Sequence, residues 1–520
     1  MGCLIAAPCS GSGKTLLSLC LTATARQRGQ SIQPFKVGPD YLDPQLLAAV
    51  AQRPCRNLDP LLCGDDWVRR CYQWHGSRAD RVLVEGVMGL FDGRGPSSDG
   101  SSAAVAALLD LPVVLVVEAS RQAGSLAALV RGFRDHGPPA VNLAGVVLNR
   151  VGSERHRALL AEALESIAVP LLGVLPHHSS LDLPSRHLGL LPPQELDDLG
   201  ERQRLWAQLA EEHLDLARLW PLLAPPTPPP QAIDPIHWLL AQPTSPAPEP
   251  GQPPQGPIQQ PPQPTQRPSV QLQAPTATEP RPSQLLPVAI ASDAAFHFRY
   301  PEAAELLRAV GLEPQPWSPL ADEPLPPGCR GVLLPGGYPE LHAETLAASR
   351  RSLSQLAAAA AAGLPIVAEC GGLLLLGQQL EDAEGRSHAM AGVLPLTARR
   401  GPLSLGYRQA EATADGLLVR RGERLMGHEF HRWQLQPTSE PALASAASLW
   451  QLEGWGSPRR AEGWTTANSH ASWLHLHWAG CPVIPRRLAA AAGRSGPQPP
   501  NGAFCSPPNN APRPPVSAGA

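Results

Sequence analysis

The chain has 520 residues, of which 43% are hydrophobic, and its formal net charge at pH 7 is −3. This length exceeds what one hydrophobic core usually supports, so we expect a globular protein of two domains. The small net charge, made of mixed signs, lacks the basic surface that attracts nucleic acids or anionic membranes. The sequence therefore predicts neither as a partner.

The ten cysteines are scattered along the chain and form no C-x-x-C pair. This pattern argues against a zinc site and a disulfide scaffold, and it favours a reducing, cytoplasmic location. The N-terminus has no charged segment before an apolar core, and no apolar run reaches about 18 residues. We therefore expect neither a signal peptide nor a transmembrane helix.

Residues 1–221 alternate short apolar runs with helix-like stretches. The expected strands are Leu4–Ala7, Val82–Glu85, Val113–Glu118 and Leu143–Asn149. Such alternation predicts βαβ units on a parallel sheet. Ligands of these sheets gather at the carboxyl ends of the strands, where this half of the chain carries its polar clusters.

Residues 222–286 and 493–520 are rich in Pro and other small or polar residues and predict a flexible linker and a disordered tail. Such segments bury too little apolar surface to offset their ordering entropy. A spacer without chemistry is the favoured interpretation of the linker, and a Pro-rich docking ligand is the alternative. Residues 287–492 predict a second α/β domain. Its expected elements are strands Val288–Ala291, Gly331–Leu334 and Ile366–Ala368, and a helix around Gln355–Ala362.

The first motif is the Gly-rich loop AAPCSGSGKT at residues 6–15. It matches the phosphate-binding pattern G-x-x-x-x-G-K-[ST], except that Pro8 stands where the first Gly is expected. In that pattern backbone N–H groups cradle the phosphates, the Lys reaches the terminal ones and the hydroxyl ligates Mg²⁺. A bland Gly/Ser loop is the alternative. The predicted nucleotide-binding residues are Gly11, Ser12, Gly13, Lys14 and Thr15.

Two other loops contain carboxylates, which a nucleotide enzyme needs to hold Mg²⁺ in an oxygen shell. Residues 35–44 read FKVGPDYLDP and include Asp40. Residues 84–93 read VEGVMGLFDG and place Glu85 at the end of a predicted strand. A helix-capping Asp or a solvated turn is the alternative interpretation for each carboxylate.

Cys370 follows a predicted buried strand and precedes the apolar helix Leu373–Leu376, in the sequence AECGG. This arrangement is typical of a nucleophile elbow, where small neighbours allow a sharp turn. The helix N-terminus lowers the thiol pKa and offers an N–H, here that of Gly371, to a developing oxyanion. Gly337, in the run PGGYPE at residues 335–340, is a candidate for the second N–H. An inert core cysteine is the alternative.

A Cys nucleophile needs a base, and a histidine distant in sequence is the expected source. The run ASWLHLH at residues 471–477 supplies His475 and His477. Each could instead be a structural histidine. A zinc site that also uses His428 and His431 is a further alternative, although the spacing H-E-x-x-H is absent.

These motifs together resemble those of the cobyrinate a,c-diamide synthase family, the glutamine-dependent amidases of corrin-ring biosynthesis. The most specific shared stretches are residues 36–44, 85–93 and 335–340. The resemblance covers nearly all of both predicted domains. It implies an α/β protein with an N-terminal P-loop domain similar to dethiobiotin synthetase and a C-terminal class I glutamine amidotransferase domain.

The resemblance also implies roles for single residues. Cys370 would be the glutaminase nucleophile and His475 its base, and Asn149 would read the adenine of ATP. The implied Mg²⁺ ligands are Thr15, Asp40 and Glu85. The residues that would shape or serve the corrinoid carboxylate site are Tyr41, Leu42, Asp43 and Asp92. His477 stands where class I enzymes usually carry a Glu, which leaves open what orients the base.

The implied reaction uses ATP and Mg²⁺ to convert a carboxylate into an acyl phosphate, which ammonia from glutamine then displaces. The expected substrates are the a and c acetates of cobyrinate, and a homodimer is possible. Enzymatic alternatives keep the chemistry and change the substrate to hydrogenobyrinate, a nickel tetrapyrrole or that of cobyric acid synthase. From a different class, the N-terminal half could be a partition-type ATPase that acts as a switch.

Overall fold

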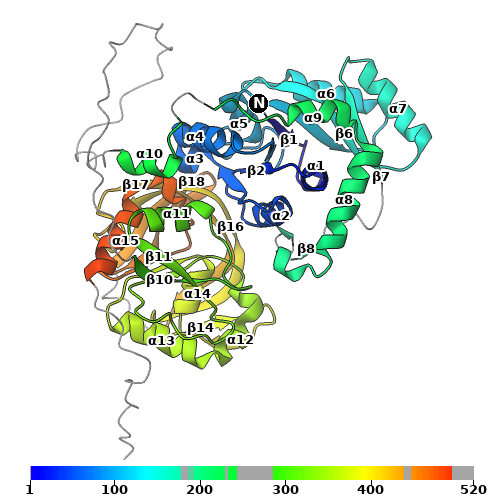
Figure 1. Cartoon of the computed structure of the whole chain (residues 1–520). Coiled ribbons are helices and arrows are strands. Elements are labelled where there is room, and N and C mark those ends of the chain that lie inside the picture. Colours follow the sequence, from blue (N-terminus) through cyan, green and yellow to red (C-terminus); the bar gives the residue numbers. More distant parts are fainter. Residues whose placement is uncertain are drawn as a thin grey trace, which may run out of the picture.

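The computed structural model describes residues 2–176, 185–186, 189–190, 192–228, 232–242, 285–438 and 447–494. The chain forms two α/β units that lie against each other (Figure 1). In the described ranges the cysteines are all free thiols. No helix in those ranges is long and apolar enough to cross a membrane.

The N-terminal unit is built on a seven-stranded sheet in the order β3-β2-β4-β1-β5-β6-β7. Every neighbouring pair is parallel, which confirms the predicted parallel sheet. Its strands are β1 (Cys3–Ala6), β2 (Ile32–Val37), β3 (Arg56–Leu58), β4 (Arg81–Glu85), β5 (Pro112–Glu118), β6 (Asn142–Val151) and β7 (Leu171–Pro176). The adjacent strands β2, β4 and β1 bring the three predicted polar loops to one edge of the sheet.

Helices cover both faces of this sheet because successive residues of a strand point to opposite sides. In β1, Leu4 and Ala6 join one core, and Cys3 and Ile5 join the other. The face that carries Leu4 and Ala6 is covered by α4 (Asp65–Gly76), α5 (Ser102–Leu109), α6 (Ser125–Asp135) and α7 (Glu154–Glu165). The second face packs α1 (Lys14–Gln27), α2 (Leu42–Ala51), α8 (Leu199–His213) and α9 (Leu216–Leu222). Short elements complete the unit: α3 (Pro60–Cys63), β8 (Ser185–Arg186) and β9 (Gly189–Leu190).

The C-terminal unit contains an eleven-stranded mixed sheet. Its parallel part, in the order β11-β10-β12-β13-β20, carries the predicted nucleophile and base. In the long part that follows, the strand pairs are antiparallel except for β14 with β16, which is parallel. The parallel strands are β10 (Leu286–Ala291), β11 (Leu312–Trp317), β12 (Val332–Leu334), β13 (Ile366–Glu369) and β20 (Ser469–Ser472). The others are β14 (Gln379–Glu381), β15 (Ser387–Ala389), β16 (Leu396–Ala412), β17 (Arg424–Pro437), β18 (Ala447–Gly454) and β19 (Ser457–Thr465).

The helices of this unit are α11 (Pro301–Ala309), α12 (Ala343–Ala348), α13 (Arg350–Ala361), α14 (Gly371–Leu376) and α15 (Val483–Arg494). The Ala-rich helix predicted around Gln355–Ala362 is thus present and begins earlier, at Arg350. Helix α15 extends to Arg494, past the expected start of the tail at residue 493.

The described part of the segment expected to be a structureless linker contains a helix, α10 (Pro235–Ala241), so the prediction is wrong there. Asp234 caps the helix by accepting the N–H groups of Ile236 and His237. Ile236 and Leu239 are buried in the core, which stabilises a short apolar run that Pro-rich flanks obscure in the sequence. Residues 229–231 and 243–284 of the expected linker, and the tail from residue 495, lie outside the described residues.

The two units share a hydrophobic core and buried polar contacts. One core cluster includes residues of both units. Arg56 of the N-terminal unit forms ion pairs with Glu302 at 2.9 Å and Glu305 at 2.5 Å, both on α11. Tyr407 Oη donates to Asp59 Oδ2 at 3.0 Å. These contacts join β3 and the residue that follows it to α11 and β16 of the C-terminal unit.

Candidate active sites

The Gly-rich loop runs from the end of β1 to the start of α1. Gly13 has a φ of 110°, and a Cβ there would lie 2.4 Å from Asn149 Nδ2, so the loop requires glycine at this position. Asn149 Nδ2 donates to the Ser12 carbonyl at 3.0 Å. The structure therefore places Asn149 against the loop, beside the helix N-terminus that favours anions.

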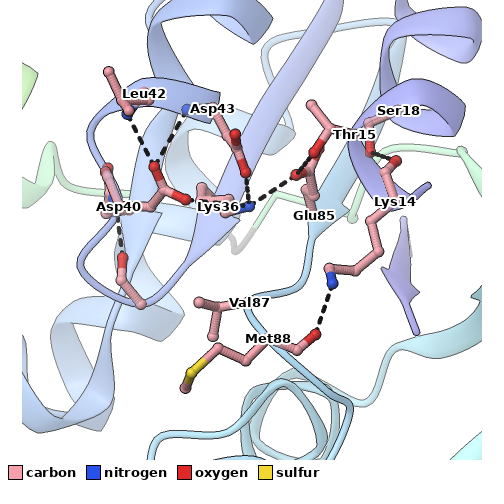
Figure 2. A network of polar contacts seen from close by, with 12 residues as sticks. Lys14, Thr15, Ser18, Lys36, Asp40, Leu42, Asp43, Glu85, Val87 and Met88 are labelled. Carbon is pink, nitrogen blue, oxygen red and sulfur yellow. Dashed lines mark hydrogen bonds and ion pairs between the residues drawn. The ribbon is translucent and has the colours of Figure 1, made fainter. Parts of the chain in front are cut away.

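Lys14 is the first residue of α1 and points toward the loop after β4 (Figure 2). Its Nζ donates to the Met88 carbonyl at 2.6 Å. Burial lowers the pKa of Lys14, and the neighbouring Lys36 lowers it further. Across the described ranges Lys14 forms no ion pair, so its charge is available to a polyanionic ligand.

Lys36, at the end of β2, connects the predicted carboxylates (Figure 2). Its Nζ lies 2.5 Å from Asp43 Oδ2, 2.8 Å from Glu85 Oε1 and 3.5 Å from Asp40 Oδ2. Glu85 Oε1 also accepts the Thr15 hydroxyl at 2.9 Å. The structure thus brings together the residues of three separate loops around one buried ammonium group.

No role for Lys36 follows from the sequence alone. Its proximity to Glu85 depends on the register that pairs these two residues across β2 and β4. A basic residue inside a buried strand, four positions before Asp40, was the available signal. Charged side chains are seldom fully buried without a partner.

The charges of this network depend on burial and on Lys36. Burial raises the pKa of Asp40 to about 7, and Asp43 adds to this effect. Burial also raises the pKa of Glu85. For Asp43 burial acts in the same direction, but Lys36 outweighs it and holds the pKa below its usual value. Burial alone would lower the pKa of Lys36, and the carboxylates instead raise it well above its ordinary value.

The donor set fits a magnesium ion. Glu85 Oε2 is buried and has no hydrogen-bond partner, and the Thr15 hydroxyl and Asp40 carboxylate lie nearby. Within the described part of the chain, no group of three or more His, Cys, Asp or Glu side chains is arranged to hold a metal by itself. Mg²⁺ usually keeps several waters and binds through one or two carboxylates plus substrate phosphates, so it does not require such a cage.

The four residues predicted for the corrinoid carboxylate site occupy different settings. The Tyr41 ring stacks on Phe298 of the C-terminal unit, with 5.2 Å between ring centroids. Leu42 is buried in a small cluster with Phe298 and Tyr338. Asp92 Oδ2 accepts the Gly89 N–H at 2.8 Å and shapes the loop after β4. Asp43 belongs to the Lys36 network, so only Asp92 stands apart from both the interface and that network.

Cys370 lies at a sharp turn between β13 and α14. Its φ of 48° and ψ of −107° are sparsely populated for a non-Gly residue, as in a strained nucleophile elbow. A Cβ on Gly371 would lie 2.9 Å from the Gly337 nitrogen, and a Cβ on Gly372 would lie 2.0 Å from the Leu334 carbonyl oxygen. Small residues are therefore required here, and the Gly371 backbone lies close to the Gly337 nitrogen.

The Cys370 thiol faces the Phe430 carbonyl oxygen at 3.8 Å. Burial raises the pKa of this thiol and Glu340 raises it further, and both outweigh the Gly371 N–H, which lowers it. The expectation that the helix N-terminus lowers the thiol pKa overall is therefore wrong. The resting thiol is consequently protonated at neutral pH, and a nucleophilic role requires a base.

His475 follows β20, the strand next to β13. Its N–H donates to the His428 carbonyl at 2.8 Å, and burial lowers the pKa of His475 to about 3. A Cβ on Gly336 would lie 2.5 Å from His475 Cε1, so the neutral imidazole packs on the loop that contains Gly337. His477 does not face the base, because its Nε2 lies 3.7 Å from Glu302 Oε2 at the interface.

The zinc alternative finds no support in the arrangement of the histidines. The His431 ring stacks on Trp473 with 4.0 Å between centroids, and its Nδ1 contacts the Trp433 carbonyl. Among the described residues, these histidines do not join a metal-holding group of His, Cys, Asp or Glu.

A cavity of about 1260 Å³ lies between the two units. Its wall includes Lys14, Asp40, Asp92, Tyr407, Phe430 and Trp455. The phosphate loop and the carboxylate network therefore open onto the same space as Phe430, whose carbonyl contacts the Cys370 thiol.

Comparison with known families agrees with this division of the chain. Residues 3–191 match the CobQ/CobB/MinD/ParA nucleotide binding domain, and residues 287–482 match the CobB/CobQ-like glutamine amidotransferase domain. The cobyrinate a,c-diamide synthase of Gloeobacter violaceus is 42% identical, with 92% of this chain and 94% of that protein covered. The hydrogenobyrinate a,c-diamide synthase of Streptomyces coelicolor is 43% identical, with 93% and 96% covered.

A P-loop nucleotide-binding domain joined to a glutamine amidotransferase domain defines an ATP-dependent, glutamine-using amidoligase. The relatives specify this class further, since they share about 40% identity over more than nine-tenths of the chain. The chain belongs to the cobyrinate a,c-diamide synthase family.

Proposed function

We propose that this enzyme amidates the a and c acetate carboxylates of cobyrinate in cobalamin biosynthesis, with ATP as the activating co-substrate and glutamine as the ammonia donor. The single observation that carries the proposal is the shared cavity, which joins the phosphate loop and its carboxylates to the neighbourhood of Cys370. The names of the relatives support the choice of substrate.

In the N-terminal unit, an acetate oxygen attacks the γ-phosphorus of ATP, which forms an acyl phosphate and releases ADP. Gly11 to Thr15 would cradle the phosphates, with Lys14 placed to neutralise the transferring group, and Asn149 would read the adenine. Thr15, Asp40 and Glu85 would hold Mg²⁺, which when bound neutralises phosphate charge. The residues proposed to serve the substrate carboxylate are Tyr41, Leu42, Asp43 and Asp92.

In the C-terminal unit, His475 takes the Cys370 proton as the sulfur attacks the side-chain carboxamide carbon of glutamine. The N–H groups of Gly337 and Gly371 would stabilise the oxyanion. The proton then leaves with ammonia, and water hydrolyses the glutamyl thioester to glutamate. Ammonia crosses the cavity, attacks the acyl phosphate carbon and displaces phosphate, which leaves the amide.

A cobalt-free substrate is the second candidate. The Streptomyces coelicolor relative, named for hydrogenobyrinate, is as similar to this chain as the cobyrinate enzymes are. Competition between cobyrinate and hydrogenobyrinate, with the diamides separated by mass spectrometry, identifies the preferred macrocycle.

The proposal is tested with purified protein, cobyrinate, ATP, Mg²⁺ and glutamine, and with mass spectrometry of the product. Two successive amidations are expected, and their absence with both macrocycles would contradict the proposal. Cys370→Ala should lose glutamine use but keep amidation at high ammonia concentration. Lys14→Ala should lose both, because acyl phosphate formation precedes either source of nitrogen.

Two lesser parts of the proposal concern the state of the enzyme in the cell. We keep the expectations of a homodimer and of a cytoplasmic location. Sedimentation velocity of the purified chain tests the first, and cell fractionation tests the second.

A further inference from the structure

Three large hydrophobic side chains that stay exposed in the described chain line the shared cavity. Met88 is 40% exposed, Leu405 is 52% exposed and Trp455 is 70% exposed. We call these three residues the apolar rim. Apolar side chains that remain in water around a concave site are typical of a ligand-binding surface.

The fold directs Leu405 toward the cavity through an irregularity in the sheet. The register of β16 against β17 shifts between Arg400 and Ser404, as at a β-bulge. Bulges re-aim side chains and are common beside active sites. Beyond the shift Leu405 pairs with Phe430, whose carbonyl contacts the Cys370 thiol, so the rim adjoins the source of ammonia.

Trp455 reaches the same cavity from the turn between β18 and β19. A Cβ on Gly95 would lie 2.5 Å from Trp455 Cγ, so the indole lies against the backbone of the N-terminal unit. Met88 has a φ of 48°, and its carbonyl oxygen accepts a hydrogen bond from the Lys14 ammonium group. The apolar rim thus extends from the phosphate loop to the β16–β17 and β18–β19 hairpins of the C-terminal unit.

We propose that the apolar rim binds the face of the corrin macrocycle, so that the C-terminal unit holds the substrate of the N-terminal unit as well as supplying its ammonia. This inference rests on the proposed function. A cavity of about 1260 Å³ is larger than the roughly 300–1,000 Å³ of most small-molecule pockets, as a macrocycle requires. Arg94 and Arg150 line the same cavity and suit the peripheral carboxylates.

The test compares Trp455→Ala and Leu405→Ala with a matched control, Leu159→Ala. Leu159 is 47% exposed on α7 and does not line the cavity. Equilibrium dialysis with cobyrinate should give a Kd about tenfold higher for each rim variant, because an apolar contact is lost. The KM for ATP and the glutaminase rate should stay within about twofold of wild type, as should every parameter of the control. Trp455→Phe, which keeps a flat apolar ring, should bind nearly as wild type does.

Each other outcome has a separate meaning. If wild type makes the diamide but both rim variants bind cobyrinate normally, the rim is not the macrocycle site and the proposed function stands. If the rim variants raise the KM for ATP and leave cobyrinate binding unchanged, the rim holds adenine and the inference is wrong. If wild type amidates neither macrocycle, the proposed function itself is wrong.

An independent observation concerns the orientation of His475. Its Nδ1 is buried without a hydrogen-bond partner, and Glu369 Oε2 lies 3.9 Å away. No other carboxylate in the described ranges forms an ion pair with His475. Glu369 is the last residue of β13, directly before Cys370, and pairs with Ser472 across β20.

We infer that Glu369 is the positioning residue of His475. Burial raises the pKa of Glu369 to about 8, so its side chain is ionised in the alkaline part of the pH range. There its carboxylate accepts the Nδ1–H, which leaves Nε2 free of a proton and able to take that of Cys370. We expect the distance of 3.9 Å between Glu369 Oε2 and His475 Nδ1 to shorten to hydrogen-bond length when glutamine binds. Catalytic hydrogen bonds are often long in ligand-free enzymes. Glu369 thereby replaces the Glu that class I enzymes carry at the position of His477, which here faces Glu302.

The test is Glu369→Gln, which is nearly the same size and uncharged. Its glutaminase rate should fall about a hundredfold, while ammonia-dependent amidation stays near wild type. In the pH profile of kcat/KM for glutamine, the difference between wild type and this variant should be largest above pH 8, where Glu369 is ionised, and should shrink toward lower pH. Glu369→Asp should recover part of the rate.

The remaining titratable groups near His475 are Tyr41 of the N-terminal unit and His428, Glu429 and His431 of β17. All are unchanged in the variant, so a rate difference that grows as pH rises through 8 reports the ionisation of Glu369. A lower rate with the same ratio to wild type at every pH, or a full rate, would show that Glu369 does not position the base.

Discussion

Lys36→Met removes the cation that forms ion pairs with Asp40, Asp43 and Glu85 among the described side chains, and it keeps most of the side-chain volume. Removing one partner of a buried ion pair costs about 3–5 kcal/mol, since the other charge is left uncompensated. Because 1 kcal/mol shifts the Tm of a domain of this size by about 2–4 °C, we expect a decrease of about 6–20 °C. Synthesis from ammonia should also be lost.

The matched control is Arg28→Met, which breaks a surface ion pair with Glu211 of similar length, 2.7 Å. An exposed pair contributes about 0–1 kcal/mol, so the control should hardly change the Tm. Adding Glu85→Gln to Lys36→Met should restore part of the loss, because one uncompensated carboxylate is removed. Thermal unfolding of the four proteins in one buffer measures these differences, and a Lys36→Met Tm equal to that of the control refutes the reasoning.

Three other predictions use the same proteins and assays. Gly372→Ala should abolish glutaminase activity and spare ammonia-dependent synthesis, because its Cβ would lie 2.0 Å from the Leu334 carbonyl; unchanged glutamine use would contradict this. Tyr41→Ala should release more glutamate than amide, because the Tyr41 ring packs between Phe298 and His475. In Tyr41→Phe glutamine hydrolysis should stay coupled to amide synthesis, and the ratio of glutamate to amide measures the difference. Burial lowers the pKa of His470 to about 3, so the stability linked to its neutral form is present above pH 6.5 and is lost as pH falls. Between pH 7 and pH 5, the free energy of unfolding measured with urea should therefore decrease by about 2 kcal/mol less for His470→Leu than for wild type.

Features that a short stretch of chain determines could be predicted from the sequence. The phosphate loop, the elbow at Cys370 and the parallel sheet depend on local spacing and apolar periodicity, and the structure has each of them. The loop forms with Pro8 in place of the first Gly, and the position in it that requires glycine is Gly13, where a Cβ would lie 2.4 Å from Asn149 Nδ2.

Features that depend on pairing between distant segments could not be predicted. Lys36 meets Glu85 through strand register, and Glu369 meets His475 because β13 and β20 are neighbours. Trp455 is one of twelve tryptophans, and only the tertiary structure places it against Gly95. Helix α10 could not be predicted from local propensity, because its stability comes from the core in which Ile236 and Leu239 are buried.

Because one core cluster includes residues of both units, we expect the units to stay associated without the covalent connection between them. The contacts between the units resemble those of a subunit interface, although both units belong to one chain. They include the ion pairs of Arg56 with two glutamates and the hydrogen bond from Tyr407 to Asp59. A protease cut between residues 243 and 284 should therefore yield two fragments that elute together and still amidate. Genes that encode the two units separately could assemble the same enzyme, so fusion here adds effective concentration and not a new structure.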